Sequence, residues 1–186
     1  MASTLQFDTW QSAAGANRNV AIQTKVTYST TKIAWSTNSS WIELSTDYRV
    51  TITPTYSNSV MVVNYYLPMN IYWSGGSNCL HVFRAFRSVG GTKSYALSSA
   101  GGQVGSARYP VAGHMFRPPG YDYNDGQSEN ITAIDLPGTT NPVTYGFEML
   151  QEASNAPTNY MGYSAGDNST WGFSSTIVIV AQEIAQ

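Results

Sequence analysis

The chain has 186 residues, a formal net charge of −2 and only 11% charged residues, which suits one domain of ordinary size. Its charges form no basic or acidic run, which argues against a nucleic-acid partner or a polybasic membrane contact. A single cysteine, Cys79, excludes an intramolecular disulfide, so stability has to come from packing. The 13 tyrosines and 5 tryptophans supply much of the apolar area needed for it.

Residues 1–22 differ from the rest of the chain. Leu5, Phe7 and Trp10 alternate with polar residues, and an alanine- and glycine-rich stretch then interrupts the pattern. The segment is too short to fold alone, so we expect an arm that attaches the protein to a larger partner through these three side chains. A disordered N-terminus is the alternative.

The N-terminal residues contain neither a charged region nor an apolar region of the kind that makes a signal peptide, which predicts synthesis in a cytoplasm. Apolar runs all stay below the length of about 20 residues that a membrane-spanning helix needs, so we expect no membrane insertion.

From residue 23 to residue 186, short runs of β-branched and aromatic residues are separated by Gly, Pro, Asn and Ser. This pattern predicts an all-β domain, an antiparallel β-sandwich or jelly roll. No segment carries the apolar stripe of an amphipathic helix. The predicted strands lie within 26–35 and at 41–44, 48–53, 60–67, 80–87, 93–97, 131–134, 143–150, 158–163 and 175–184.

Two of these strands, 60–67 and 175–184, are apolar on both faces. A two-layer sandwich covers one face of each strand, so the other face has to meet a further layer, which we expect to be another copy of the chain. The residues predicted for this interface are Val62, Ile177, Val178, Ile179 and Val180.

The sequence contains few candidates for catalytic residues. His81 lies within a strand, where a structural role is expected, and His114 is expected to be a surface contact residue. Phosphate-loop, nucleophile-elbow and zinc-protease motifs are absent from the sequence. We therefore expect no enzyme activity and no cofactor, although a pair of carboxylates for glycoside hydrolysis stays open, because their separation in space is not visible in a sequence.

Residues 122–129 superficially resemble a calcium-binding loop. Gly126 is fifth from Asp122, however, and not sixth as in an EF-hand, so a turn with solvated carboxylates is favoured over a metal site. Arg84 and Arg87 are three residues apart on one strand and therefore face opposite sides. Arg84 is expected either to project inward onto a carboxylate or to face a neighbouring subunit.

Three segments, 68–78, 100–128 and 153–171, are not strand-like but are rich in aromatic residues. Tyr, Trp, Ser, Gly and Asn are typical of adaptable recognition loops. Packing of the loops on each other and across the assembly is the alternative. The residues predicted to contact a receptor are Tyr72, Trp73, Tyr121 and Tyr123, with Asp122 and Asp125 as hydrogen-bond acceptors.

The order of several strand-and-turn motifs resembles a known family. The motifs are Thr4–Trp10, Trp41–Leu44, Val50–Pro54, Ser57–Val62, Ala133–Pro137, Val143–Phe147 and Ser175–Ile184. In this order they resemble short tail-fibre and knob-like virion structural proteins of tailed phages, notably of marine and cyanobacterial hosts. The C-terminal modules of that family look like the trimeric jelly rolls of the C1q and tumour-necrosis-factor group.

The resemblance implies a non-enzymatic homotrimer in a virion, with the last strand near the threefold axis. It would be a knob or fibre-tip component that binds other tail, fibre or capsid proteins and contacts a glycan or protein of the host surface. A capsid decoration or head-fibre protein is the first alternative. A secreted carbohydrate-binding module or glycan-active enzyme is the second.

Overall fold

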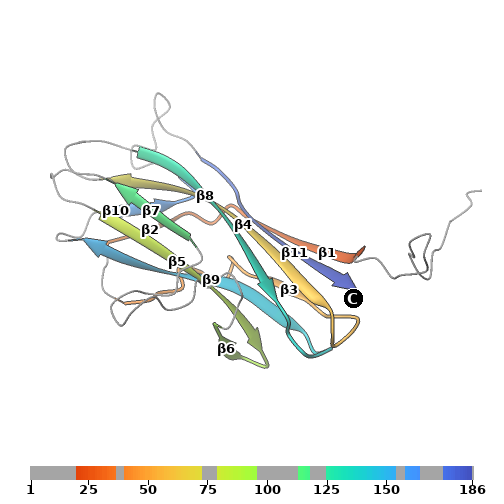
Figure 1. Ribbon diagram of the computed structural model, residues 1–186. Coiled ribbons are helices and arrows are strands. Elements are labelled where there is room, and N and C mark those ends of the chain that lie inside the picture. Colours follow the sequence, from red (N-terminus) through yellow and green to blue (C-terminus); the bar gives the residue numbers. More distant parts are fainter. Residues whose placement is uncertain are drawn as a thin grey trace, which may run out of the picture.

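The structure is a computed structural model that describes residues 20–36, 40–72, 79–95, 113–117, 125–153, 158–163 and 174–185. These residues form eleven strands and no helix, so the predicted all-β fold is confirmed (Figure 1). A helix long and apolar enough to cross a membrane is not found among them.

The first sheet has six strands, and its long central strand is β4 (Val60–Tyr72). On one side β4 pairs with β8 (Asp125–Asp135); on the other it pairs first with β11 (Ile177–Ala185) and then with β10 (Thr158–Met161). Two outer strands complete the sheet, β1 (Val20–Ser29) beside β11 and β2 (Ile33–Trp35) beside β10. All pairings are antiparallel, and the predicted central position of 60–67 is confirmed.

The second sheet has five strands. Its order starts with β3 (Val50–Ile52), β9 (Val143–Ala153) and β5 (Cys79–Val89). Both β6 (Thr92–Ser94) and β7 (Gly113–Arg117) pair with the other side of β5.

The strand pairs are nested along the chain. The first strand pairs with the last, β3 with β9, and β4 with β8, while β5 pairs with β6 and β7, which follow it. Such nested antiparallel pairing, distributed over two layers, is the wrapping of a jelly roll. Figure 1 shows the two layers, with β1, β11, β4 and β8 in one and β3, β9 and β5 in the other.

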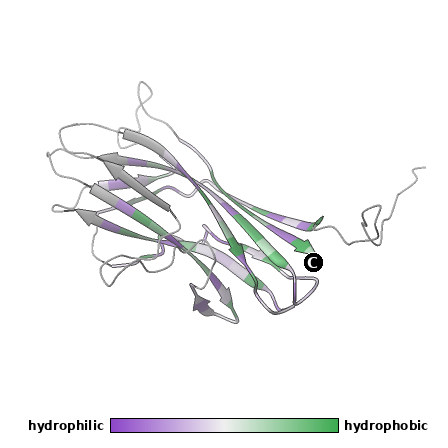
Figure 2. Ribbon diagram, in the orientation of Figure 1, coloured by the Kyte–Doolittle hydropathy of each residue, from purple (hydrophilic) through white to green (hydrophobic). Residues whose placement is uncertain are grey.

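The core lies between the two sheets, because residues alternate between inside and outside along each strand. Figure 2 shows this alternation as bands of different hydropathy along the ribbons. The ring of Phe147 on β9 is central: Tyr48 stacks on it at 6.0 Å, and Tyr65 meets it edge-on at 6.1 Å. Phe83 contacts the same ring at 6.4 Å, so aromatic side chains from both sheets fill the interior.

Several element bounds differ from the sequence expectations. Residues 41–44 make only an isolated bridge, Ile42 to Met149, and β7 lies within a segment expected to contain no strand. The first strand begins at Val20, inside the expected 1–22 arm. Most of all, β8 begins at Asp125 and not near 131, because the whole stretch pairs with β4 through Asp125 opposite Ile71. The pairing with β4 makes residues 125–130 a strand although their composition is polar.

Candidate functional site

The outer surface of the first sheet is the most distinctive surface of the described residues. The strand registers align side chains from β1, β11, β4 and β8 in rows, such as Val26–Val180–Asn64–Thr132. We call this surface the apolar face. It consists of Thr24, Val26 and Tyr28; Val178, Val180, Gln182 and Ile184; Val60, Val62, Asn64 and Tyr66; and Asn130, Thr132 and Ile134. We include Ile22, which lies at the bulge of β1 between Ala21 and Gln23 and is exposed.

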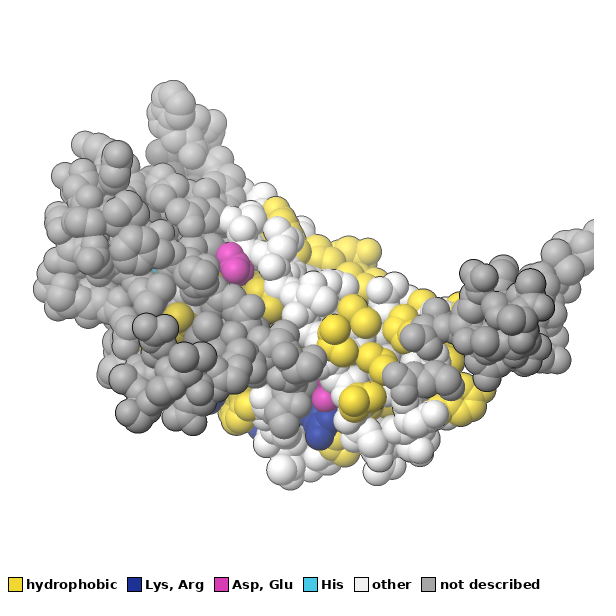
Figure 3. All heavy atoms as spheres, viewed as in Figure 1, with side chains coloured by type: hydrophobic (Ala, Val, Ile, Leu, Met, Phe, Trp, Pro, Cys, Tyr) yellow, Lys and Arg dark blue, Asp and Glu magenta, His cyan; other side chains and the backbone are white. Residues whose placement is uncertain are grey.

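The apolar face leaves large hydrophobic side chains open to solvent. Tyr28 is 72% exposed, Ile134 is 46% exposed, and Ile22, Val26 and Tyr66 are each about 40% exposed. Leu136, which follows β8 directly, is 63% exposed. In Figure 3 hydrophobic side chains gather over the part of the molecule where Figure 1 places these four strands.

None of the residues that make up the apolar face carries a charge. Four strands spaced about 4.8 Å apart and about six residues of length give a surface on the order of 400 Å². The exposed apolar side chains make up part of this area, and the largest apolar patch on a protein surface is often a functional one. Charged side chains normally help to keep soluble monomers apart, and this face has none.

The predicted interface residues divide between the two sides of the sheet. Val62, Val178 and Val180 lie on the apolar face, and their assignment to an interface stays a prediction. Ile177 and Ile179 do not lie on this face: they are 1% and 0% exposed and belong to the core between the sheets. Their assignment to an interface is wrong, because β11 turns alternate residues inward and both of its faces are apolar.

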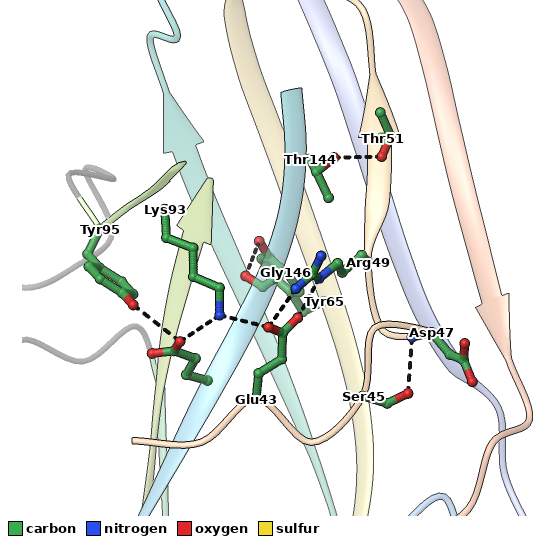
Figure 4. Close-up of polar contacts among 11 residues, drawn as sticks. Glu43, Ser45, Asp47, Arg49, Thr51, Tyr65, Lys93, Tyr95, Thr144 and Gly146 are labelled. Atoms are coloured by element: carbon green, nitrogen blue, oxygen red, sulfur yellow. Dashed lines mark hydrogen bonds and ion pairs between the residues drawn. The ribbon is translucent and has the colours of Figure 1, made fainter. Parts of the chain in front are cut away.

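The outer surface of the second sheet is different in character, because it carries a network of ion pairs (Figure 4). Glu43 receives two hydrogen bonds from Arg49, at 2.5 and 2.7 Å, and one from Lys93 at 2.7 Å. Lys93 Nζ also lies 2.8 Å from Glu148, which in turn accepts hydrogen bonds from Arg84. We call these five residues the charged network.

Aromatic rings fix the cations of the charged network in place. The Arg84 guanidinium lies 4.3 Å from the centre of the Trp41 ring and 3.9 Å from that of Tyr95. Lys93 Nζ lies 4.2 Å from the ring of Phe86. Arg84 therefore points outward from the sheet onto a carboxylate, whereas Arg87 crosses toward the first sheet and bonds Asp135 at 2.7 Å.

Within the charged network, each carboxylate is paired with cations. Burial raises the pKa of Glu148, but hydrogen bonds and attraction from Lys93 and Arg84 outweigh it and hold that pKa below 4.5. The pKa of Glu43 is lowered in the same way, against burial, by Arg49 and Lys93. Both carboxylates are therefore ionised and paired at neutral pH, and neither is poised as a general acid.

A third feature is the end of the sandwich at which most of the predicted recognition segments begin and finish. Tyr72 pairs with Thr158 and Ile71 with Asp125, while Cys79 pairs with both Arg117 and Ala153. The strand ends that flank 73–78, 118–124 and 154–157 thus converge at one end of the molecule, which we call the loop end.

The structure places the predicted receptor residues only in part. Tyr72 is the last residue of β4 and Asp125 the first of β8, so both backbones lie in strands at the loop end. Trp73, Tyr121, Asp122 and Tyr123 lie outside the described residues, as do Leu5, Phe7 and Trp10 of the predicted arm. The predicted turn over 122–129 is wrong from Asp125 onward, because those residues are extended in β8.

Buried polar side chains lie beneath the loop end. His81, Gln151 and Asn159 are each at most 2% exposed, and Asn159 Nδ2 donates to Gln151 Oε1 at 2.7 Å. The His81 ring meets Trp35 edge-on at 6.2 Å. Burial lowers the pKa of His81 to about 4, although a hydrogen bond with Asn159 raises it, so the imidazole is neutral at pH 7. Its surroundings are those of a packing residue, and the sequence had no signal for the two amides around it.

Comparison with known proteins adds no family: neither the family models nor the curated proteins that were searched include a match to this chain. The described residues also contain no group of three or more His, Cys, Asp or Glu side chains that could hold a metal ion.

Proposed function

We propose that this chain is a non-enzymatic structural protein that assembles as a homotrimer through the apolar face and serves as a knob or fibre-tip component of a tailed-phage virion. The observation that carries the proposal is the uncharged, partly exposed apolar face on β1, β11, β4 and β8. The virion role and the number three are supported by the sequence resemblance described above.

Self-association would account for the difference between the outer surfaces of the two sheets. The two sheets share a core, yet the ion pairs of the charged network, among the residues that the structure describes, lie on the outer surface of the second sheet. A sheet face that stays in water normally carries charged and polar side chains, whereas the described face of the first sheet has no charge and leaves Tyr28, Val26 and Ile134 exposed. Burial of Tyr28, Val26 and Ile134 against another copy would remove this exposed area from water.

The proposal divides the molecule into regions. The apolar face joins the subunits, residues 1–19 link them to other virion proteins, and the loop end faces the host surface. The convergence of the strand ends at Tyr72, Asp125 and Thr158 supports the last assignment, because it places separate recognition segments around a common surface.

The test is a comparison of two aspartate substitutions. Val178→Asp places a charge on the apolar face and is expected to reduce the mass measured by light scattering to that of one chain, without change in the far-ultraviolet circular dichroism. Thr144→Asp on the outer surface of the second sheet is the matched control and should keep the assembly. A single-chain mass for the unsubstituted protein at micromolar concentration would refute self-association.

The position on a particle needs a separate experiment. Antibody labelling of purified virions, viewed by electron microscopy, is expected to mark the tail or the fibre tips. Labelling spread over the capsid would refute a knob role and favour a decoration protein.

A further inference from the structure

The apolar face is interrupted at its centre by two primary amides. Gln182 lies opposite Val62, and Asn64 lies opposite Val180, on the two inner strands β11 and β4. The amides thus alternate with valines in a block of four residues, flanked by β1 on one side and β8 on the other.

These amides have hydrogen-bonding capacity that the described contacts do not use. Asn64 Oδ1 accepts a hydrogen bond from Thr132 at 2.7 Å, which leaves the two N–H groups of Nδ2. No described residue bonds the side chain of Gln182. Both residues are already half-buried in the single chain, so any layer that covers the apolar face has to satisfy them.

A second copy of the chain is the partner that can do so. An amide both donates and accepts, so it can bond to its own symmetry copy, whereas a charged side chain in the same place would repel its copy. In a closed symmetric assembly, residues near the axis meet their own counterparts. The central strands β11 and β4 are where such an axis can pass between apolar faces.

We propose that Asn64 and Gln182 form hydrogen bonds between subunits and thereby fix the number and register of subunits in the assembly. This inference rests on the proposed self-association through the apolar face. If only valines met at the interface, one subunit could shift along the other, because neighbouring apolar contacts have nearly the same free energy. An amide that is covered without a partner costs free energy, so only the register that pairs the amides is stable. A polar residue in an apolar seam acts in this way in coiled coils.

The first experiment replaces both amides by residues of similar volume, Asn64→Val together with Gln182→Leu. Native mass spectrometry is expected to show one stoichiometry for the unsubstituted protein and a mixture of at least two for the variant. Thr51→Val with Thr144→Val, on the outer surface of the second sheet, is the control and should keep one stoichiometry. A variant with the single stoichiometry of the unsubstituted protein would overturn the inference.

The second experiment measures whether the amide positions meet their counterparts. In a Cys79→Ser background, Asn64→Cys and Gln182→Cys are each treated with a short bis-maleimide, and covalent dimers are expected on a denaturing gel. Thr144→Cys is the control and should stay a single chain. An oligomer that yields no dimer from either position would overturn the inference but leave self-association standing, whereas a monomeric unsubstituted protein would refute the self-association itself.

Discussion

Glu183 shows how this fold handles a carboxylate inside the sandwich. It is 0% exposed, yet its described partners are all neutral. It accepts hydrogen bonds from Ser59 Oγ at 2.6 Å, from the backbone N–H of Thr55 at 2.7 Å and of Tyr56 at 3.2 Å, and from Gln23. These bonds attach the turn between β3 and β4 to the last strand. They also keep the pKa of Glu183 below 4.5, although burial raises it.

We predict that Glu183→Gln lowers the free energy of unfolding by about 2 kcal/mol, because an amide N–H would face donors where a carboxylate oxygen accepts. Since the folded-state pKa is lowered, the stabilisation is present above pH 4.5 and is lost as the pH falls through that folded value. Urea denaturation at pH 7 measures the effect, with Asp47→Asn, an exposed carboxylate, as the control that should change little. Equal stability of the Glu183 variant would contradict the assignment.

His81 gives a second pH dependence in a separate range. Burial places its folded-state pKa at about 4, below the ordinary 6.5, so the neutral form is stabilised in the core. The sign follows from proton uptake: the unfolded chain binds the proton first as the pH falls, so stability present above pH 6.5 declines down to about pH 4.

From this shift we predict a decline on the order of 3 kcal/mol in unfolding free energy between pH 7 and pH 4. The variant His81→Gln should remove most of the slope above pH 4.5, while His114→Gln should keep it. Thermal or urea unfolding at a series of pH values measures the slope. A slope that is the same in the His81 variant and the unsubstituted protein would show that this imidazole is not responsible.

At the level of elements, the contact between β5 and β9 depends on a glycine. Gly146 lies directly opposite Phe86 on the outer surface of the second sheet. A Cβ at position 146 would come within 2.5 Å of Phe86 Cζ, so the ring occupies the place of the missing side chain. The same ring supports Lys93 of the charged network.

Gly146→Ala is therefore expected to displace the Phe86 ring and to destabilise the protein by about 2 kcal/mol, the cost of overpacking a tight site. The double variant with Phe86→Leu should lose less than the sum of the two single changes, because the smaller side chain leaves room. Gly138→Ala is a control, because Gly138 has open space around its Cβ position but a φ of 67°. Any loss of stability in that variant reports backbone strain and not packing. Additive losses in the double variant would contradict the proposed contact.

The strands also show what could be predicted from sequence. Runs of β-branched residues predicted the strand at Val60–Tyr66 and the terminal strand. In the structure these two strands, β4 and β11, lie next to each other in the interior of the first sheet. The polar residues of β8 and the short β7 could not be predicted, because their pairing with β4 and β5 comes from tertiary contacts. The inner and outer faces of β11 could not be distinguished either: Ile177 and Val178 are equally apolar, and the inward residue Glu183 suggests the opposite phase.

For the whole molecule, the two outer surfaces suggest different responses to salt. The charged network lies on the second sheet, away from the apolar face. The exposed fractions of its five side chains range from 7% for Glu148 to 30% for Arg49. The apolar face itself has no charge to screen. Assembly through it should then depend on hydrophobic burial, which excluded salts such as sulfate strengthen.

We predict that the assembly keeps its mass, measured by sedimentation velocity, from low ionic strength to 1 M sodium chloride, which shortens the screening length to about 3 Å. Sodium sulfate should lower the protein concentration at which the assembly dissociates, because it favours burial of Val178, Val180 and their neighbours. The control is Val178→Asp, which should stay a single chain in sodium chloride at any of these strengths. Dissociation of the unsubstituted protein by sodium chloride would mean that ion pairs hold the subunits together, and the contact would then have to be sought on the charged surface of the second sheet.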